Sequence, residues 1–167
     1  MTNKVKRYYL EINSIQDLKE GNKPLDQYIL SLIDPINFQL NKFFYKNIGK
    51  KHKWIDRLAW TETQWIDYLS SKKVKTYVLK NHKDLVGFFE LIDHFENKEI
   101  EIAYFGILEE YQNKNLGSYL LSKAIKKSYE KDIKRVWLHT CSLDHQNALN
   151  NYLARGMKIF KTETIIF

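Results

Sequence analysis

Several segments of this chain alternate apolar and polar residues, which is the period of a half-buried strand. Residues 4–13 show it first, with Val5, Tyr8, Leu10 and Ile12 as the apolar positions. Further strands are predicted over residues 75–80, 85–93, 99–108, 135–141 and 157–167. The polar residues 81–84 then predict a hairpin loop between the first two of these.

Between the strands, apolar residues recur three or four positions apart, which is the helical period. Pro24 is suited to begin a helix over residues 25–33, and Pro35 is suited to end it. Thr61 and Gln64 have the spacing of a capping box. The segments predicted to be helical are residues 25–33, 36–47, the stretch from Thr61 onward, 116–130 and 144–155.

Apart from the partly helical stretch from Thr61 onward, the predicted elements run in the order strand, helix, helix, three strands, helix, strand, helix, strand. This mixture predicts an α+β fold rather than a strict alternation of strands and helices. At 167 residues, the chain has the length of a single domain with one core. We therefore assign residues 1–167 to one domain.

Residues 104–118 join an apolar strand to a polar turn and then to an amphipathic helix. The first N–H groups of a helix have no intrahelical partner, and the helix dipole adds positive potential, so the backbone itself can bind a phosphate there. Gly117 leaves room for a close approach, and Asn115 is a residue type that tolerates positive φ. The segment predicts an anion site, although an ordinary strand–turn–helix connection has the same pattern.

A second segment also places a helix after a strand. Residues 136–141 predict the strand, Asp144 is a suitable N-cap, and Gly156 is a suitable C′ residue, so the helix between them is short. Ala148 and Tyr152 are four residues apart and therefore share one face of this helix.

The first of these segments resembles motif A of the GNAT acyltransferases, Gln/Arg-x-x-Gly-x-Gly/Ala. Here the motif reads Gln112-x-x-Asn115-x-Gly117, with asparagine in place of the first glycine. In that family the loop holds the pyrophosphate of acetyl-CoA. The resemblance therefore implies a specific anion for the predicted site.

The second segment resembles motif B of the same family. Ala148, Tyr152 and Gly156 fall on their places without a gap, while His145 replaces an asparagine and Met157 replaces a phenylalanine. Two motifs in the right order are more specific than either motif alone.

The resemblance is specific from about Gly87 to the C-terminus, and it implies a GNAT-like fold. That fold is a central, mostly antiparallel sheet of about six strands, splayed in the middle and flanked by helices. The family usually has two strands after the last helix, whereas the residues from 157 onward suffice for one. We therefore expect either a sheet that ends early or one completed by a second chain in a homodimer.

The resemblance also implies acetyl-CoA as the cosubstrate and a set of contacts to it. Phe105, Gly106 and Ile107 match the strand end that binds the pantetheine arm, with the N–H near Phe105 as the oxyanion donor and Gly106 easing a bulge. The other residues implied to bind the cofactor are Gln112, Asn113, Lys114, Asn115, Leu116, Gly117, Ser118, His145, Ala148 and Tyr152.

Two side chains are candidates for proton transfer. The resemblance implies that Tyr152 protonates the CoA sulfur; the alternative is a half-buried core tyrosine. Glu101 is the candidate base, and strand alternation places it on the same face as Phe105 and opposite Tyr104. The alternatives for Glu101 are a solvated strand residue or a lysine partner, with water relaying the proton.

Other reactive residues are weaker candidates. His139 and His145 lack the spaced ligands of a metal site, so we expect no metal and interpret His139 as a packing residue. Cys141 is the single cysteine and has no evident activating base, which makes it a weak nucleophile. Most aromatic residues of the first half should lie in the core, with one or two lining the acceptor pocket: Phe43, Phe44, Tyr45, Trp54, Trp60 and Trp65.

The net charge of +7 comes mainly from scattered lysines. Nucleic-acid binding proteins more often carry arginine-rich stripes, so we consider nucleic acid an improbable partner, whereas the charge suits an anionic cofactor. We find neither an apolar signal core nor a run long enough to span a membrane, and we expect a protein of the reducing cytosol.

Together these features predict an N-acetyltransferase that moves the acetyl group of acetyl-CoA directly to a primary amine of a small molecule or protein. Transfer of a longer acyl group is one alternative. A catalytically idle module that binds CoA for regulation is another.

Overall fold

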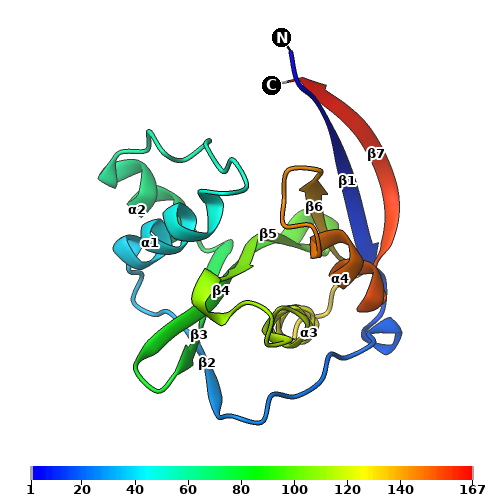
Figure 1. Cartoon of the computed structure of the whole chain (residues 1–167), viewed down its shortest axis with the longest axis horizontal. Coiled ribbons are helices and arrows are strands. Elements are labelled where there is room, and N and C mark those ends of the chain that lie inside the picture. Colours follow the sequence, from blue (N-terminus) through cyan, green and yellow to red (C-terminus); the bar gives the residue numbers. More distant parts are fainter. Residues whose placement is uncertain (1, 167) are drawn as a thin grey trace.

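A computed structural model describes residues 2–166 of the chain (Figure 1). Its strands are β1 (Lys4–Ile12), β2 (Tyr28–Leu32), β3 (Val74–Asn81), β4 (Asp84–His94), β5 (Glu99–Ile107), β6 (Arg135–Cys141) and β7 (Lys158–Ile166). Its α-helices are α1 (Phe38–Gly49), α2 (Glu62–Ser70), α3 (Leu116–Ser128) and α4 (Ala148–Ala154). The predicted α+β class is confirmed.

The strands form one seven-stranded sheet in the order β2-β3-β4-β5-β6-β1-β7. Every neighbouring pair is antiparallel except β5 and β6, which are parallel. These two strands pair only from Glu99 with Arg135 to Glu101 with Trp137. Beyond that point they separate, so the predicted splay in the middle of the sheet is confirmed.

The end of the sheet differs from the expectation drawn from the C-terminus. β1 pairs with β6 on one side and with β7 on the other. The N-terminal strand of the same chain therefore supplies the strand that residues 157–167 could not supply, and the sheet does not end early. Figure 1 shows β1 and β7 side by side, with the two termini close together at the tip of this ribbon.

Helices cover both faces of the sheet around the splay (Figure 1). On one face, Phe44 of α1 stacks on Phe88 of β4 with ring centroids 4.9 Å apart. On the other face, α3 buries Leu116, Leu120, Leu121 and Ile125 against the sheet. We call these the α1/α2 face and the α3/α4 face. The sheet thus divides the core into two parts.

The helix predicted over residues 25–33 is wrong. Residues 28–32 form the edge strand β2, which pairs antiparallel with β3. Tyr28 and Leu30 pack against the core, whereas Ile29 is 60% exposed and Leu32 is 44% exposed. A short apolar run fits either period, and pairing with β3 decides in favour of the strand.

The helix after β6 is shorter than predicted. It begins at Ala148, and its N-cap position is Asn147 rather than Asp144. Its end agrees with the prediction, because Gly156 has φ +101°. The capping box of Thr61 and Gln64 at the start of α2 is confirmed. Within residues 2–166, we find no helix that is long and apolar enough to cross a membrane.

Candidate active site

A cavity of about 750 Å³ lies where β5 and β6 separate. Small-molecule sites usually have volumes of ~300–1,000 Å³. On the α3/α4 face it is lined by Phe105, Leu116 and Tyr152. On the α1/α2 face it is lined by Ile48 and by Trp54 of the α1–α2 loop. The cavity therefore reaches both faces of the sheet through the splay.

The turn before α3 forms one end of this cavity. Asn113 has φ 63° and Asn115 has φ 60°, so two asparagines adopt the left-handed conformation that glycine usually supplies. Asn115 is the N-cap residue of α3, and its side chain makes no capping hydrogen bond. Within residues 2–166, no protein acceptor takes the N–H groups of Leu116, Gly117 or Ser118. The turn thus offers free backbone donors to an anion.

Packing against the rest of the protein does not require a glycine at position 117. A Cβ atom there would meet only the Asn151 side chain, at an ordinary 3.6 Å. By contrast, a Cβ on Gly106 would lie 2.6 Å from Ile48, and one on Gly87 would lie 2.6 Å from the Gly106 carbonyl oxygen. The open space at Gly117 belongs to the cavity, which is what a closely bound ligand requires.

The residues predicted to bind the cofactor gather around this cavity, with one exception. It is lined by Phe105, Gly106, Ile107, Gln112, Asn113, Asn115, Leu116, Gly117, Ser118, His145, Ala148 and Tyr152. Lys114 lies outside the lining, with its ammonium 5.3 Å from the centroid of the Tyr111 ring. Gln112 also stabilises the local structure, because its side-chain amide donates a hydrogen bond to the Ile107 carbonyl at 3.3 Å.

Arg155 lines the same end of the cavity and was missed in the sequence. Its Nε is buried without a hydrogen-bond partner in the described part of the chain. Glu20 also lines this end, but its carboxylate pairs with Lys126. An arginine near the end of a short helix gives no sequence signal, because its position depends on how α4 packs beside α3.

Tyr152 is 8% exposed, and its ring meets that of Phe105 edge to face at 6.4 Å. Its hydroxyl has no hydrogen-bond partner among residues 2–166, although the residue lines the cavity. Burial, and to a lesser degree the Asp144 carboxylate, raise the pKa of Tyr152. The phenol therefore stays protonated near neutral pH and can act as a hydrogen-bond or proton donor.

The placement of Glu101 differs from the alternation predicted for β5. Glu90 pairs with Tyr104 and Leu91 pairs with Ile102, so Ala103 is an extra residue in the strand. Because of this bulge, Glu101 lies on the same face as Tyr104, and Phe105 lies on the opposite face. The bulge falls at Ala103 and not at Gly106. Alternation of apolar residues cannot reveal one inserted residue.

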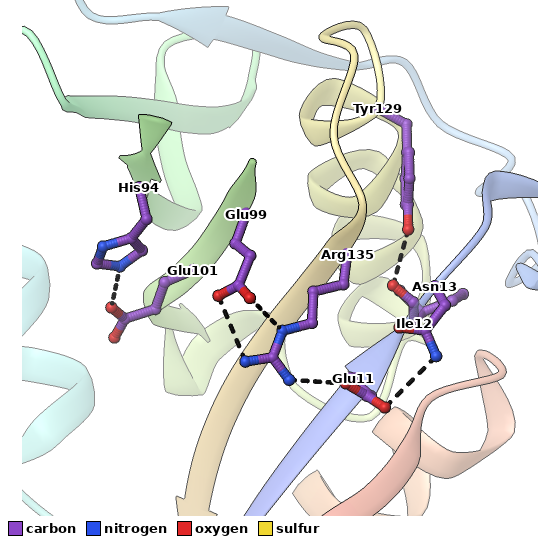
Figure 2. Close-up of polar contacts among 8 residues, drawn as sticks. All are labelled: Glu11, Ile12, Asn13, His94, Glu99, Glu101, Tyr129 and Arg135. Atoms are coloured by element: carbon purple, nitrogen blue, oxygen red, sulfur yellow. Dashed lines mark hydrogen bonds and ion pairs between the residues drawn. The ribbon is translucent and has the colours of Figure 1, made fainter. Parts of the chain in front are cut away.

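Glu101 does not line the cavity. It occupies the last position at which β5 pairs with β6. Figure 2 shows its carboxylate directed toward His94, and Glu101 Oε1 lies 3.0 Å from His94 Nε2. His94 in turn stacks on Trp137, with centroids 5.8 Å apart. Its partner is thus a histidine and not the lysine considered from the sequence.

The neighbouring carboxylates of Glu99 and Glu11 also have partners. Arg135 pairs with Glu99 at 2.9 Å and with Glu11 at 2.7 Å, which ties together three adjacent strands (Figure 2). Glu11 also accepts a hydrogen bond from Asn13. This acidic group on β5 and β1 therefore holds the sheet together where β5 and β6 still pair.

The other end of the cavity lies between the α1–α2 loop and the loop after β6. Asp144, the predicted N-cap, instead accepts hydrogen bonds on Oδ2 from the Thr140 hydroxyl and from the Cys141 N–H, the latter at 3.0 Å. Across the cavity, the rings of His52 and His145 meet at 6.0 Å. Together with Trp54, these residues form a wall of aromatic rings and one carboxylate.

The α1–α2 loop is held in place by a buried ion pair. Arg57 contacts both carboxylate oxygens of Glu90, at 2.9 and 3.1 Å, and Glu90 also accepts from Tyr68 at 2.8 Å. Arg57 lies over the ring of Tyr104 at 4.2 Å. Because the removal of one partner of such a pair is costly, this network fixes the loop that carries Trp54. Of the six aromatic residues considered for the acceptor pocket from the sequence, Trp54 lines the cavity.

Cys141 and His139 lie outside the cavity lining. Burial and the nearby Asp144 raise the pKa of the Cys141 thiol, which lowers its thiolate fraction. Cys141 is therefore poorly suited to act as a nucleophile. His139 is an exposed residue of β6, and its ring lies beside that of Tyr9 with centroids 5.5 Å apart.

The splayed sheet and the amide-lined turn define an acetyltransferase fold. The model of the acetyltransferase (GNAT) family matches residues 38–157, which is more than half of the chain. The chain therefore belongs to the GNAT acetyltransferase family. No curated protein sequence matches it significantly.

Solved structures with this fold have low sequence identity to the chain. A GCN5-related N-acetyltransferase from Sphaerobacter thermophilus has 13% identity and a TM-score of 0.70, covering 99% of this chain and 51% of its own. The putative acetyltransferase YycN from Bacillus subtilis has 20% identity and a TM-score of 0.60, covering 81% of this chain and 94% of its own. An aminoglycoside acetyltransferase from an uncultured soil metagenomic sample has 11% identity and a TM-score of 0.63, covering 77% and 86%.

The chain spans from about half to about three-fifths of the length of the first three structures that it matches. At these identities the likeness concerns the fold alone.

Proposed function

We propose that residues 1–167 form a single acetyltransferase domain, which transfers the acetyl group of acetyl-CoA directly to a primary amine. One observation carries the proposal: free backbone donors and the uncrowded Gly117 open into a cavity that crosses the splay of the sheet. A fold that used this turn only as a connection would have no need of the empty space.

The residues present fit acetyl-CoA. The N–H groups of residues 113–118 would bind its pyrophosphate, and Arg155 would add a positive charge beside it. The edge of β5 at 105–107 has no β6 partner, so it would bind the pantetheine arm. The N–H near Phe105 would then donate to the thioester oxygen as negative charge develops on it.

The amine would enter from the side of the α1–α2 loop and attack the thioester carbon. As the carbon–sulfur bond breaks, the Tyr152 hydroxyl would protonate the leaving thiolate and later regain a proton from solvent. Glu101 lies outside the cavity lining and is bonded to His94. We therefore assign removal of the amine proton to water or to free amine from solution, with Glu101 as the alternative to test.

The test has two stages. Calorimetry with acetyl-CoA should show binding at one site per chain, and a panel of primary amines should then release free CoA thiol. If acetyl-CoA does not bind, the proposal is wrong. Binding without thiol release from any amine would identify a catalytically idle CoA-binding module. Faster release from a longer acyl-CoA would identify transfer of that acyl group. The cytosolic location and the homodimer expected from the sequence remain predictions.

A further inference from the structure

The charged residues that line the cavity lie at its two ends. Arg155 and Glu20 belong to the end formed by the turn before α3, and Glu20 is paired with Lys126. Asp144 belongs to the opposite end, beside Trp54 and His145. Within residues 2–166, Asp144 has no lysine or arginine partner in ion-pair distance, so its carboxylate faces the cavity without a compensating cation.

The two oxygens of Asp144 are used differently. Oδ2 is fixed by the Thr140 hydroxyl and the Cys141 N–H at the end of β6. Oδ1 has a single contact, with the Trp54 indole N–H at 3.5 Å, which is at the outer limit of a hydrogen bond. The carboxylate is therefore oriented by one oxygen and retains acceptor capacity on the other.

The surroundings of Oδ1 suit a cation on an apolar chain. The Trp54 side chain borders Oδ1 through its indole N–H and lines the same wall of the cavity, so its ring offers apolar surface to the chain that carries the cation. Asp144 also contributes to the raised pKa of Tyr152, so the carboxylate acts at short range on the proposed proton donor. A group held at Oδ1 would lie in the same cavity as the thioester.

We propose that Oδ1 of Asp144 binds the ammonium group of the acceptor, and that the enzyme therefore selects cationic amines carried on an apolar or aromatic chain. The bound ammonium would lose one proton to water or to free amine from solution before the neutral nitrogen attacks the thioester carbon. An amine next to a carboxylate would be disfavoured, because that second charge would repel Asp144. The inference rests on the proposed function, and it adds the chemical class of the acceptor and the residue that recognises it.

The test uses 2-phenylethylamine as the cationic aromatic probe and phenylalanine as the matched amine with a carboxylate. Asp144→Asn removes the charge and keeps an oxygen that can accept from Cys141 and Thr140. We expect KM for 2-phenylethylamine to rise ~10–100-fold, because hydrogen bonds to charged groups contribute about 1.5–3 kcal/mol. The dissociation constant of acetyl-CoA should stay unchanged. Asp67→Asn, an exposed position of α2, removes the same charge outside the cavity and should leave both values unchanged.

Binding without turnover separates this inference from the proposed function. Ligand-observed NMR of 2-phenylethylamine on the CoA-saturated protein should show ~10–100-fold weaker binding to Asp144→Asn. If binding depends on Asp144 while no amine is acetylated, the proposed function fails and the cation site stands. Equal binding to wild type and Asp144→Asn overturns the site, and so does a wild-type protein that fails to bind 2-phenylethylamine or prefers phenylalanine.

A second variant guards against misfolding. Asp144→Glu keeps the charge one methylene further from the backbone, so it should bind 2-phenylethylamine more tightly than Asp144→Asn at equal acetyl-CoA affinity. If Asp144→Asn does not fold, Asp144→Glu is compared with wild type. The wild-type preference for 2-phenylethylamine over uncharged 2-phenylethanol then tests the site, and equal affinity for the two probes overturns it.

Discussion

The two halves of β5 lie on one strand but have different neighbours. Residues 99–101 pair with β4 on one side and with β6 on the other, and their carboxylates are bonded to Arg135 and His94. Residues 105–107 pair with β4 alone, and they line the cavity on their free edge. The first half carries the charged groups, whereas the second offers mainly backbone.

This difference separates residues that resemble catalytic groups in the sequence from residues that line the cavity. A glutamate on a central strand suggests a catalytic base, yet contacts with neighbouring strands account for both glutamates of the first half: Glu99 pairs with Arg135, and Glu101 is hydrogen-bonded to His94. The second half has no charged side chain, but its unpaired edge opens into the cavity beside Tyr152 and Gly117. Substitutions should therefore affect stability in the first half and ligand binding or turnover around the second.

The largest effect is expected at the turn facing the second half. Gly117→Glu should abolish acetyl-CoA binding, because the side chain fills the cavity and repels the pyrophosphate. Calorimetry measures this directly. Gly117→Ala should keep a folded protein, since the new Cβ would meet only Asn151 at 3.6 Å. Ser142→Glu adds the same charge at an exposed position outside the cavity and serves as the control. Unchanged affinity in Gly117→Glu would remove the turn from the cofactor site.

Tyr152→Phe tests the proposed proton donor that faces the second half. We expect kcat to fall ~10²–10⁴-fold, because general acid assistance is worth that much, while acetyl-CoA affinity stays unchanged. Stopped-flow measurement of thiol release separates the chemical step from product release. If the chemical step keeps its rate, Tyr152 is a core tyrosine and the thiolate is protonated by solvent.

The sequence predicted the turn before α3 and the strand positions better than the register within β5. The turn at 113–118 was predicted because asparagine and glycine have distinct backbone preferences, which act locally. The strands between 75 and 141 were predicted because their apolar period is regular. Both signals come from residues that are neighbours in the sequence, so they can be recognised without knowledge of the fold.

What was missed depends on contacts between distant residues. The bulge at Ala103 and the pairing of β1 between β6 and β7 leave no periodic signal. Asp144 is a residue type common at the N-cap of helices, but its carboxylate accepts hydrogen bonds from Thr140 and Cys141 and does not cap α4. The strand at 28–32 has apolar spacing that also fits a helix, and only its pairing with β3 decides. These features are determined by pairing between residues that are distant in the sequence, so local sequence patterns could not predict them.

Arg135→Met tests the structural character of the first half. The substitution leaves Glu11 and Glu99 without their shared partner, and these carboxylates are 16% and 20% exposed. We expect the free energy of unfolding to fall by ~1–3 kcal/mol in urea denaturation, since a partly buried acceptor loses its charged donor. Acetyl-CoA affinity should not change. Lys134→Met at an exposed neighbouring position controls for the loss of charge. A variant as stable as wild type but weak in acetyl-CoA binding would assign the first half to the ligand site.

The smallest effect is expected at Glu101, where the two halves meet. Its side chain is hydrogen-bonded to His94 and lies outside the cavity lining, and a glutamine there can still bond His94. Glu101→Gln should therefore change kcat/KM by less than threefold, whereas loss of a general base is expected to cost ~10²–10⁴-fold. The decisive measurement is the pH profile of kcat/KM for wild type and variant on one acceptor of known pKa, because the amine itself titrates. Overlaying profiles would leave deprotonation to water or to free amine. If Glu101→Gln instead flattens the acidic limb and slows the reaction while acetyl-CoA affinity is kept, Glu101 is the base. The hydrogen bond with His94 would then have to break during the reaction, and the boundary between the structural half of β5 and its proposed ligand-binding half would lie before residue 101.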